Sequence, residues 1–307
     1  MRIPNVLKAL FYFGLIPVFF LVAFRLGADT KENSNRAAEA SPRTGLTSPA
    51  ISAQATPDPA AGYSLELAAG QSAAVSGIAD TRFLELVNHD YKLAGEPGDG
   101  LVVPAWPTVP VSAKTVTIHG EALQAVSKLF DSAREAYDCT FYISSGYRSC
   151  EEQKQVYDGA SDKSFAQPPN HSEHQTGLAA DIFIIGIGQN DMAKSREAQW
   201  LAENAWKYGL LLRYPANKQG TTGISYEPWH FRYIGRIHAW YCFQNDMCFE
   251  EYIQFLKEAL GYKADLDGQS YTVSYQFPDD GLIYLPENGN YDISGDNTGG
   301  YIVTAWE

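Results

Sequence analysis

The order of helix-like and strand-like segments between Phe83 and Gly261 constrains the fold more than any other feature of this sequence. Apolar residues at helical spacing predict a helix over Glu121–Tyr137. Further helices are predicted over Cys150–Tyr157, Arg196–Tyr208 and Glu250–Leu260. Strands are predicted over Phe83–Val87, Leu101–Val103, Val116–Ile118, Thr140–Ser144, Leu178–Ile185, Leu210–Tyr214 and Trp229–Tyr233. Strands and helices are mixed without regular alternation. This order predicts an α+β core with a small antiparallel sheet and flanking helices.

The regions on either side of this core, residues 77–261, differ from it in composition. Residues 29–76 are rich in Ala, Ser, Thr, Pro and Gly, which predicts a disordered stalk. After Gly261, short strand-like runs alternate with Gly, Asp and Asn turns. They predict a small β-rich C-terminal appendage over residues 262–307.

The first 28 residues have the pattern of an export signal. Arg2 and Lys8 precede an apolar run from Ala9 to Phe24. This run is slightly short for a membrane span of about 20 residues and long for a cleaved signal core of about 7–15 residues. A cleaved signal peptide and a retained signal anchor therefore both remain open, and either places the rest of the chain outside the cytoplasm.

The net charge and the cysteines limit which partners the chain can bind and indicate which covalent links it can form. The formal net charge of -13 argues against nucleic acid as a partner, because the phosphate backbone would be repelled. The four cysteines fall into two close pairs, Cys139 with Cys150 and Cys242 with Cys248. In an exported chain these pairs predict two local disulfides.

Two segments bring together the residue types that bind a metal ion. They are residues 171–181, with His174 and Asp181, and residues 227–230, which end in His230. Imidazole and carboxylate groups are zinc ligands, and three of them leave a fourth position open for water. His174, Asp181 and His230 are therefore predicted to hold one Zn²⁺ ion, with His171 as the nearest competitor of His174.

Two further residues suggest catalysis beside this metal. Glu227 lies three residues before His230, so its carboxylate is placed to take a proton from the water on the metal and pass it to a leaving amine. Arg148 lies in a turn between a predicted strand and a predicted helix. An arginine there is either an ordinary surface residue or a clamp for a carboxylate or an oxyanion.

Three separated motifs resemble the D-alanyl-D-alanine carboxypeptidases of the VanY type, LAS-type zinc peptidases of peptidoglycan. They are Ser-Gly-Tyr-Arg-Ser at 145–149, Ser-Glu-His-Gln-Thr-Gly-Leu-Ala-Ala-Asp at 172–181, and Glu-Pro-Trp-His-Phe-Arg-Tyr-Ile-Gly at 227–235. The resemblance covers about Phe83 to Gly261. It implies a zinc metallopeptidase, independent of a catalytic serine, that removes a C-terminal D-alanine from peptidoglycan stem peptides.

The resemblance also implies a role for each matched residue. On the family pattern His174, Asp181 and His230 match the zinc ligands and Glu227 the catalytic base. Arg148 matches the arginine that binds substrate or stabilises the oxyanion. The positions that line the substrate site are matched by Gln153, Ser172 and Trp229.

Relatives with this metal arrangement cut different bonds, so an L,D-carboxypeptidase or a D,D-dipeptidase of the same family is an alternative. A catalytically silent, zinc-containing module that binds the cell wall is an alternative from another class, and it would require Glu227 to close the fourth metal position. The expected partners are a peptidoglycan stem peptide and, if the N-terminal segment is uncleaved, the membrane. The expected location is the extracytoplasmic side of the membrane or the cell wall.

Overall fold

A computed structural model of the chain describes residues 71–307, apart from Ala94, Glu96, Gly98, Asp99, Trp106, Asp138 and Asn288. The predicted signal segment and residues 29–70 of the predicted stalk lie outside the described residues. Among the helices of the described part, none is long and apolar enough to span a membrane.

A four-stranded antiparallel sheet in the order β4-β5-β7-β6 lies at the centre of the predicted core. Its strands are β4 (Phe141–Ser145), β5 (Ala179–Ile184), β7 (His230–Tyr233) and β6 (Leu210–Leu212). Strand β5 pairs with β4 on one side and β7 on the other, so that Asp181 lies opposite both Ser145 and His230. The small antiparallel sheet of the predicted α+β fold is confirmed.

Helix α2 (Gly120–Ala136) packs against this sheet, as its apolar spacing predicted. His119 caps its N-terminus by accepting a hydrogen bond from the backbone amide of Glu121. Val126, Leu129 and Phe130 are completely buried in one apolar cluster with residues of β4 and β5. Burial of each such side chain stabilises the fold by roughly 1.5–3 kcal/mol.

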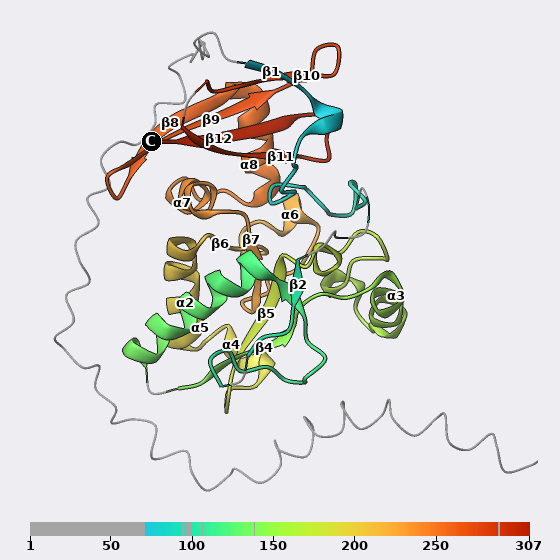
Figure 1. The fold of residues 1–307 in the computed structure, drawn as a ribbon. Helices are drawn as coiled ribbons and strands as arrows, with labels where there is room; N and C mark the ends of the chain where they lie inside the picture. The colour runs from blue at the N-terminus through green and yellow to red at the C-terminus, as the bar shows by residue number, and fades with distance from the viewer. Residues whose placement is uncertain are drawn as a thin grey trace, which may run out of the picture. The chain divides into compact units, whose positions relative to one another are not determined.

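The remaining helices either connect the strands of this sheet or follow its last strand, β7 (Figure 1). They are α3 (Cys150–Gly159), η2 (Lys163–Phe165), η3 (Glu173–Thr176), α4 (Gln189–Met192), α5 (Arg196–Asn204), η4 (Ala205–Tyr208), α6 (Gln219–Thr222), α7 (Arg236–Gln244) and α8 (Phe249–Ala259). A two-stranded hairpin of β2 (Leu101–Val102) and β3 (Ile118–His119) precedes α2. Helix α7 was not predicted, because six consecutive residues from Ile237 to Cys242 are buried and the helix has no polar stripe to reveal its period.

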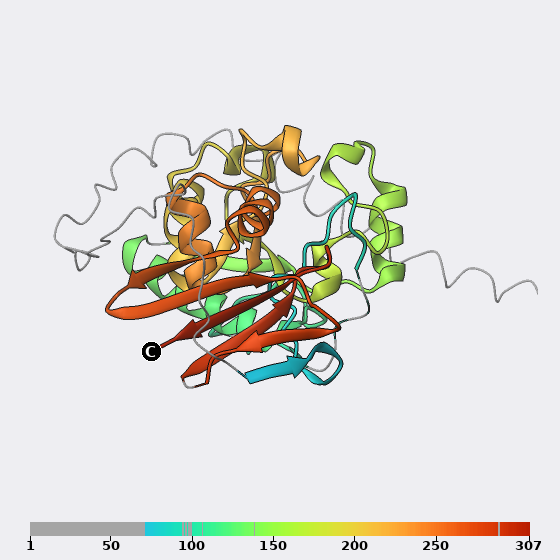
Figure 2. The ribbon, with the colours of Figure 1, turned by 90° about the horizontal axis from the view of Figure 1, so that it is seen from above.

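A second antiparallel sheet contains most of the C-terminal appendage, in the order β11-β12-β9-β8. Its strands are β8 (Gly261–Leu266), β9 (Gln269–Gln276), β11 (Asn290–Gly295) and β12 (Tyr301–Trp306). Figures 1 and 2 show α7 and α8 lying against this sheet, and their side chains share one apolar core with β8, β9 and β12. The predicted boundary at 261–262 thus falls inside a strand.

The last residues of the predicted stalk pair with a strand of the C-terminal appendage. Strand β1 (Gln71–Ala74) pairs with β10 (Leu282–Leu285), and the 3-10 turn η1 (Val75–Gly77) follows it. Residues 71–76 of the predicted stalk therefore have secondary structure. The pairing partner lies more than 200 residues away, so local composition did not reveal it.

The predicted strand over residues 83–87 is wrong. This segment is a turn and an extended stretch without a strand partner in the described sheets, although Leu84, Leu86 and Val87 are buried. The side chain of Arg232 donates hydrogen bonds to the carbonyls of Phe83 and Glu85, at 3.1 Å each. An arginine side chain thus satisfies these carbonyls in place of a neighbouring strand.

The prediction of two disulfides is also wrong, because all four cysteines are thiols in the structure. Cys139 and Cys150 lie beyond opposite ends of β4, whose five residues extend roughly 16 Å at about 3.3 Å per residue. A disulfide requires Cα atoms within about 7 Å. Cys242 in α7 and Cys248 before α8 are buried, where they pack as small apolar side chains.

Candidate metal centre and substrate pocket

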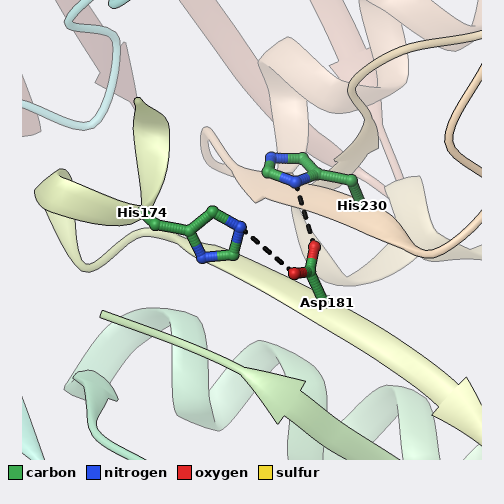
Figure 3. Close-up of side chains that lie close together, drawn as sticks. All are labelled: His174, Asp181 and His230. Carbon is green, nitrogen blue, oxygen red and sulfur yellow. Dashed lines mark hydrogen bonds and ion pairs between the residues drawn. The ribbon is translucent and has the colours of Figure 1, made fainter. Parts of the chain in front are cut away.

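Three side chains from three different elements meet above the central sheet. His174 comes from η3, Asp181 from β5 and His230 from the start of β7. Because Asp181 and His230 are cross-strand neighbours, the register alone brings their side chains close together. Figure 3 shows both imidazole rings pointing toward the Asp181 carboxylate, with 3.3 Å from His174 Nε2 to Oδ2 and 3.1 Å from His230 Nδ1 to Oδ1.

A hydrogen bond to the turn after β4 fixes the orientation of the His174 ring. His174 Nδ1 donates this bond to the carbonyl of Gly146 at 2.6 Å, which leaves the Nε2 lone pair facing Asp181. Gly146 must lack a side chain, since a Cβ there would lie 2.2 Å from the carbonyl oxygen of Thr117. Gly177 ends η3 with a φ of 73°, a left-handed conformation that glycine adopts readily and that turns the chain into β5.

The geometry and chemistry of this trio fit a metal ion. One donor atom from each residue lies within 4.8 Å of the other two. His174 Nε2 is buried and has no hydrogen-bond partner among the described residues, which is costly unless another group occupies the space before it. Burial and the nearby Arg148 cation lower the pKa of His174 to about 4, so its ring is neutral, as a metal ligand must be.

Glu227 lies beside this trio without belonging to it. Its Oε2 is 3.7 Å from His230 Nδ1, and the residue is 6% exposed. Burial raises the pKa of this carboxyl to about 8, and the negative charge of Asp181 adds to the effect. A carboxyl with a pKa near neutrality exchanges a proton readily, as a general acid or base requires.

An open pocket with a volume of about 190 Å³ lies in front of these residues. Every residue that the sequence predicted for the site lines it, and they are Arg148, Gln153, Ser172, His174, Asp181, Glu227, Trp229 and His230. The structure therefore brings together all eight predicted side chains from across the core.

Arg148 lines this pocket and is tied to the metal trio through its backbone. Its backbone amide donates to the carbonyl of His174 at 3.1 Å, which ties the turn before α3 to the metal trio. Its Nε is buried and has no hydrogen-bond partner in the described part of the chain. Burial lowers the pKa of Arg148, while Asp181 and Glu227 counteract that shift.

The three predicted substrate contacts offer different chemistry. Gln153 donates from Nε2 to the carbonyl of Gln167 at 2.6 Å, and its buried Oε1 has no hydrogen-bond partner among the described residues. Ser172 precedes η3 without a capping bond from its side chain. Trp229 stacks on Phe183 with ring centroids 5.6 Å apart and thereby forms a flat apolar wall.

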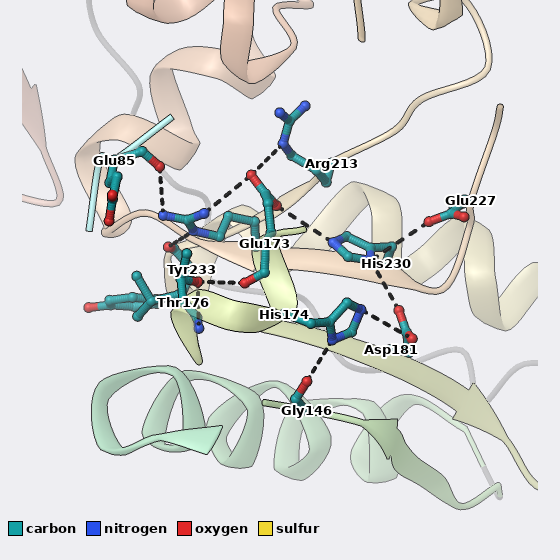
Figure 4. Close-up of polar contacts among 12 residues, drawn as sticks. Glu85, Gly146, Glu173, His174, Thr176, Asp181, Arg213, Glu227, His230 and Tyr233 are labelled. Carbon is teal, nitrogen blue, oxygen red and sulfur yellow. Dashed lines mark hydrogen bonds and ion pairs between the residues drawn. The ribbon is translucent and has the colours of Figure 1, made fainter. Parts of the chain in front are cut away.

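The sequence did not predict several residues that shape the site. Tyr214 is buried against the His230 ring at a centroid distance of 4.9 Å, and Val156 and Phe165 place exposed apolar side chains in the pocket. Behind His230, Glu173 forms ion pairs with two buried arginines (Figure 4). The position of Glu173 next to His174 was the only available signal. His171, the predicted competitor for the metal, instead bonds the carbonyl of Asn88 at 2.7 Å.

Fold and site together define a protein with a His-Asp-His metal-binding arrangement on an antiparallel sheet and a buried carboxyl and guanidinium beside it. The VanY family profile, described as D-alanyl-D-alanine carboxypeptidase, matches residues 115–236, a range that contains all of these residues. The chain is 38% identical over 188 residues to a D-alanyl-D-alanine carboxypeptidase of Enterococcus faecium, and the match covers 61% of this chain and 60% of the relative.

A second relative is covered almost completely. The chain is 31% identical to the bifunctional D-Ala-D-Ala dipeptidase and D-Ala-D-Ala carboxypeptidase VanXYC of Enterococcus gallinarum, over 58% of this chain and 96% of that protein. This chain belongs to the VanY family.

Solved structures give the same relationship. The vancomycin resistance D,D-dipeptidase VanXYg, in complex with a D-Ala-D-Ala phosphinate analog, superposes with a TM-score of 0.65 at 33% identity, over 73% of this chain and 94% of that chain. The LD-carboxypeptidase LdcB superposes with a TM-score of 0.51 at 35% identity, over 56% of this chain and 86% of that chain.

Proposed function

We propose that this chain is a zinc-dependent carboxypeptidase that removes a C-terminal D-alanine from peptidoglycan stem peptides. The observation that supports it most is the convergence in one pocket of the metal-binding trio, the perturbed carboxyl of Glu227 and the guanidinium of Arg148. Relatives named as D-alanyl-D-alanine carboxypeptidases support the substrate class.

His174 Nε2, an Asp181 carboxylate oxygen and His230 Nδ1 would hold the metal ion. These atoms are the buried imidazole and carboxylate donors that zinc prefers, and three protein ligands are typical of a catalytic zinc. Zinc bound there would supply Lewis acidity toward the scissile carbonyl and would lower the pKa of a water molecule, so that loss of a proton makes it a nucleophile.

The residues around the trio supply the remaining steps. The Glu227 carboxylate accepts a proton from the attacking water and returns it to the amine of the departing D-alanine. The Arg148 guanidinium, with a donor that lacks a partner in the described residues, binds the terminal carboxylate of the substrate or the oxyanion that develops at the cut bond. Gln153 and Ser172 offer polar contacts to the peptide, and Trp229 offers an apolar surface.

The position of Glu227 favours an enzyme over a silent zinc module. A structural zinc site closes its fourth position with a protein ligand. The described metal-binding group contains three residues, and the Glu227 carboxylate lies 3.7 Å from a ligand nitrogen instead of joining that group. Three protein ligands would leave a fourth position for water beside the Glu227 carboxylate, which is the arrangement that hydrolysis needs.

A related activity has independent support, because the chain also resembles LdcB, an LD-carboxypeptidase. An L,D-carboxypeptidase would remove the last D-alanine of a tetrapeptide, whereas the proposed activity removes it from a pentapeptide. A D,D-dipeptidase would instead hydrolyse free D-Ala-D-Ala.

We also propose that the enzyme acts outside the cytoplasmic membrane, anchored by its N-terminal segment or secreted to the wall. Its proposed substrate is found there, and the sequence of residues 1–28 has the pattern of an export signal.

Hydrolysis assays would test these proposals. The full chain would be incubated with stem pentapeptide, stem tetrapeptide and free D-Ala-D-Ala, each with and without a chelator, and released alanine would be measured by mass spectrometry. We expect chelator-sensitive loss of one alanine from the pentapeptide. Loss from the tetrapeptide alone would identify an L,D-carboxypeptidase, and an inert protein that retains zinc would refute the proposed hydrolase.

A further inference from the structure

A chain of buried charges leads from the metal trio to helix α8. Glu173 Oε1 accepts from Arg213 Nε at 2.7 Å and lies 3.2 Å from Arg232 Nη1. Arg213 in turn donates two hydrogen bonds, of 2.6 and 2.8 Å, to the carboxylate of Glu250 in α8. Glu173, Arg213 and Arg232 are almost completely buried. Charges buried in this way are costly unless each is paired.

The other oxygen of Glu173 faces the metal trio. Glu173 Oε2 lies 3.6 Å from His230 Nε2, the ring nitrogen remote from Asp181. Both atoms are buried, and neither has a hydrogen-bond partner within the described residues. Glu173 Oε2 and His230 Nε2 are therefore polar neighbours, at a separation slightly longer than a hydrogen bond.

This geometry favours Nδ1 of His230 as the metal-binding nitrogen, because Nδ1 faces the metal trio and Nε2 faces Glu173. A carboxylate beside Nε2 favours a proton there, because the N–H then points at a negative charge. With a metal ion bound, Nδ1 would give up its proton and offer its lone pair, and Nδ1 is the nitrogen that faces Asp181 and Glu227 at 3.1 and 3.7 Å. A carboxylate that orients a metal-bound histidine in this way raises the basicity of the ligand and fixes its ring.

We propose that Glu173 is a positioning residue that holds His230 in its metal-binding orientation. This inference rests on the proposed zinc site. The Glu173 carboxylate contacts neither the metal position nor the pocket in front of it, since it does not line that pocket. Ion pairs with Arg213 and Arg232 fix the position of the Glu173 carboxylate, and an ion pair with Glu250 in α8 fixes Arg213. Helix α8, which packs in the core under the C-terminal sheet, thereby supports the position of His230.

The balance of charge explains why the arrangement is stable when buried. Glu173 and Glu250 carry two negative charges against the two positive charges of Arg213 and Arg232, each paired at 3.2 Å or less. A neutral, hydrogen-bonded cluster avoids most of the cost of an unpaired buried ion. Arg232 also donates to two backbone carbonyls of the segment before β2, which anchors that arginine from a second side.

The test measures zinc affinity, by competition with a chromogenic chelator, for the wild-type chain and for Glu173→Gln. The substitution keeps the shape of the side chain and removes its charge. We expect the affinity to fall roughly 10- to 100-fold, the usual effect of losing such a partner. An unchanged affinity in a folded Glu173→Gln chain would overturn the proposal.

Asp296→Asn is the matched control. Asp296 is a fully buried carboxylate remote from the pocket that accepts hydrogen bonds from Tyr275 Oη at 2.7 Å and the amide of Gly300 at 2.9 Å. Its substitution removes a buried carboxylate charge without touching His230, so zinc affinity should stay at the wild-type value. An equal loss of affinity in both variants would mean that general destabilisation is responsible, and would also overturn the proposal.

A measurement on the wild-type chain avoids dependence on any variant. The ¹⁵N shifts of the His230 imidazole in the zinc-loaded protein should show a protonated Nε2 and a metal-bound Nδ1. Zinc on Nε2 would contradict the assignment of Glu173. A wild-type chain that binds no zinc at all would refute the proposed metal site instead, so the two failures are distinguishable.

Discussion

Replacement of Glu227 by glutamine should abolish most of the activity while making the metal-free protein more stable. The amide has nearly the same shape as the carboxylate but cannot accept a proton. General acid–base groups contribute typically about 10²–10⁴ in rate, so kcat should fall by that factor. Zinc should remain bound, because Glu227 does not belong to the described metal-binding group.

The gain in stability follows from the cost of burying this carboxylate. The pKa of Glu227 is raised by burial from 4.5 to about 8, so between these values the unfolded chain is ionised and the folded chain is not. The unfolded state then binds fewer protons, and the stability of the wild type falls as the pH rises through this interval. At about 1.4 kcal/mol per pH unit, the penalty reaches roughly 3 kcal/mol at pH 7 and about 5 kcal/mol above pH 8.

The assay is chemical denaturation of the wild type and of Glu227→Gln in the presence of a chelator, at several values between pH 5 and pH 8. The stability of the variant should exceed that of the wild type by an amount that grows with pH. With zinc present the difference should shrink, because a nearby cation favours the charged carboxylate. Equal stabilities at all pH values would refute the buried environment assigned to Glu227. An active variant would refute its role as the base.

Three further predictions concern the metal, a buried histidine and the cysteines. His230→Ala should lose zinc, since one of three ligands is gone, and a metal analysis showing full occupancy would contradict the ligand set. His238 is buried between Tyr252 and Thr304, and burial lowers its pKa to about 3. The stabilisation from this neutral histidine should be fully present above its unfolded pKa of 6.5, and the free energy of unfolding should fall by about 2 kcal/mol from pH 7 to pH 5. Denaturation curves of His238→Gln should lack this dependence on pH. Because all four cysteines are thiols, reductant should leave activity and thermal stability unchanged, and a clear loss of either would show that a disulfide forms.

The sequence was informative wherever the signal is local. Helix α2 was predicted within one residue at each end, because its apolar stripe repeats with the period of the helix. The side chains of the site were predicted as a group, because the chain has only six histidines and the matched residues stand in motifs with defined spacing. The structure brings all eight of these side chains to one pocket.

Some interpretations failed because they depended on distance in space. The spacing of Cys139 and Cys150 suggested a disulfide, but both are thiols in the structure, and strand β4 lies between them in the chain. The segment 83–87 has strand-like composition, yet its carbonyls bond an arginine that lies some 150 residues away. Apolar composition reports that a segment is buried, and it does not report what covers it.

By itself the sequence determined which side chains have the chemistry to bind a metal ion or accept a proton, and where most helices and strands of the core lie. Tertiary structure alone decided that the C-terminal sheet shares its core with α7 and α8, and that Glu173 stands behind His230 between two buried arginines. Periodicity and motifs are properties of neighbouring residues, whereas ion pairing and shared cores arise from residues that the fold brings together across the chain. The chemical identity of a side chain is therefore visible in the sequence, and its electrostatic surroundings exist only once the chain has folded.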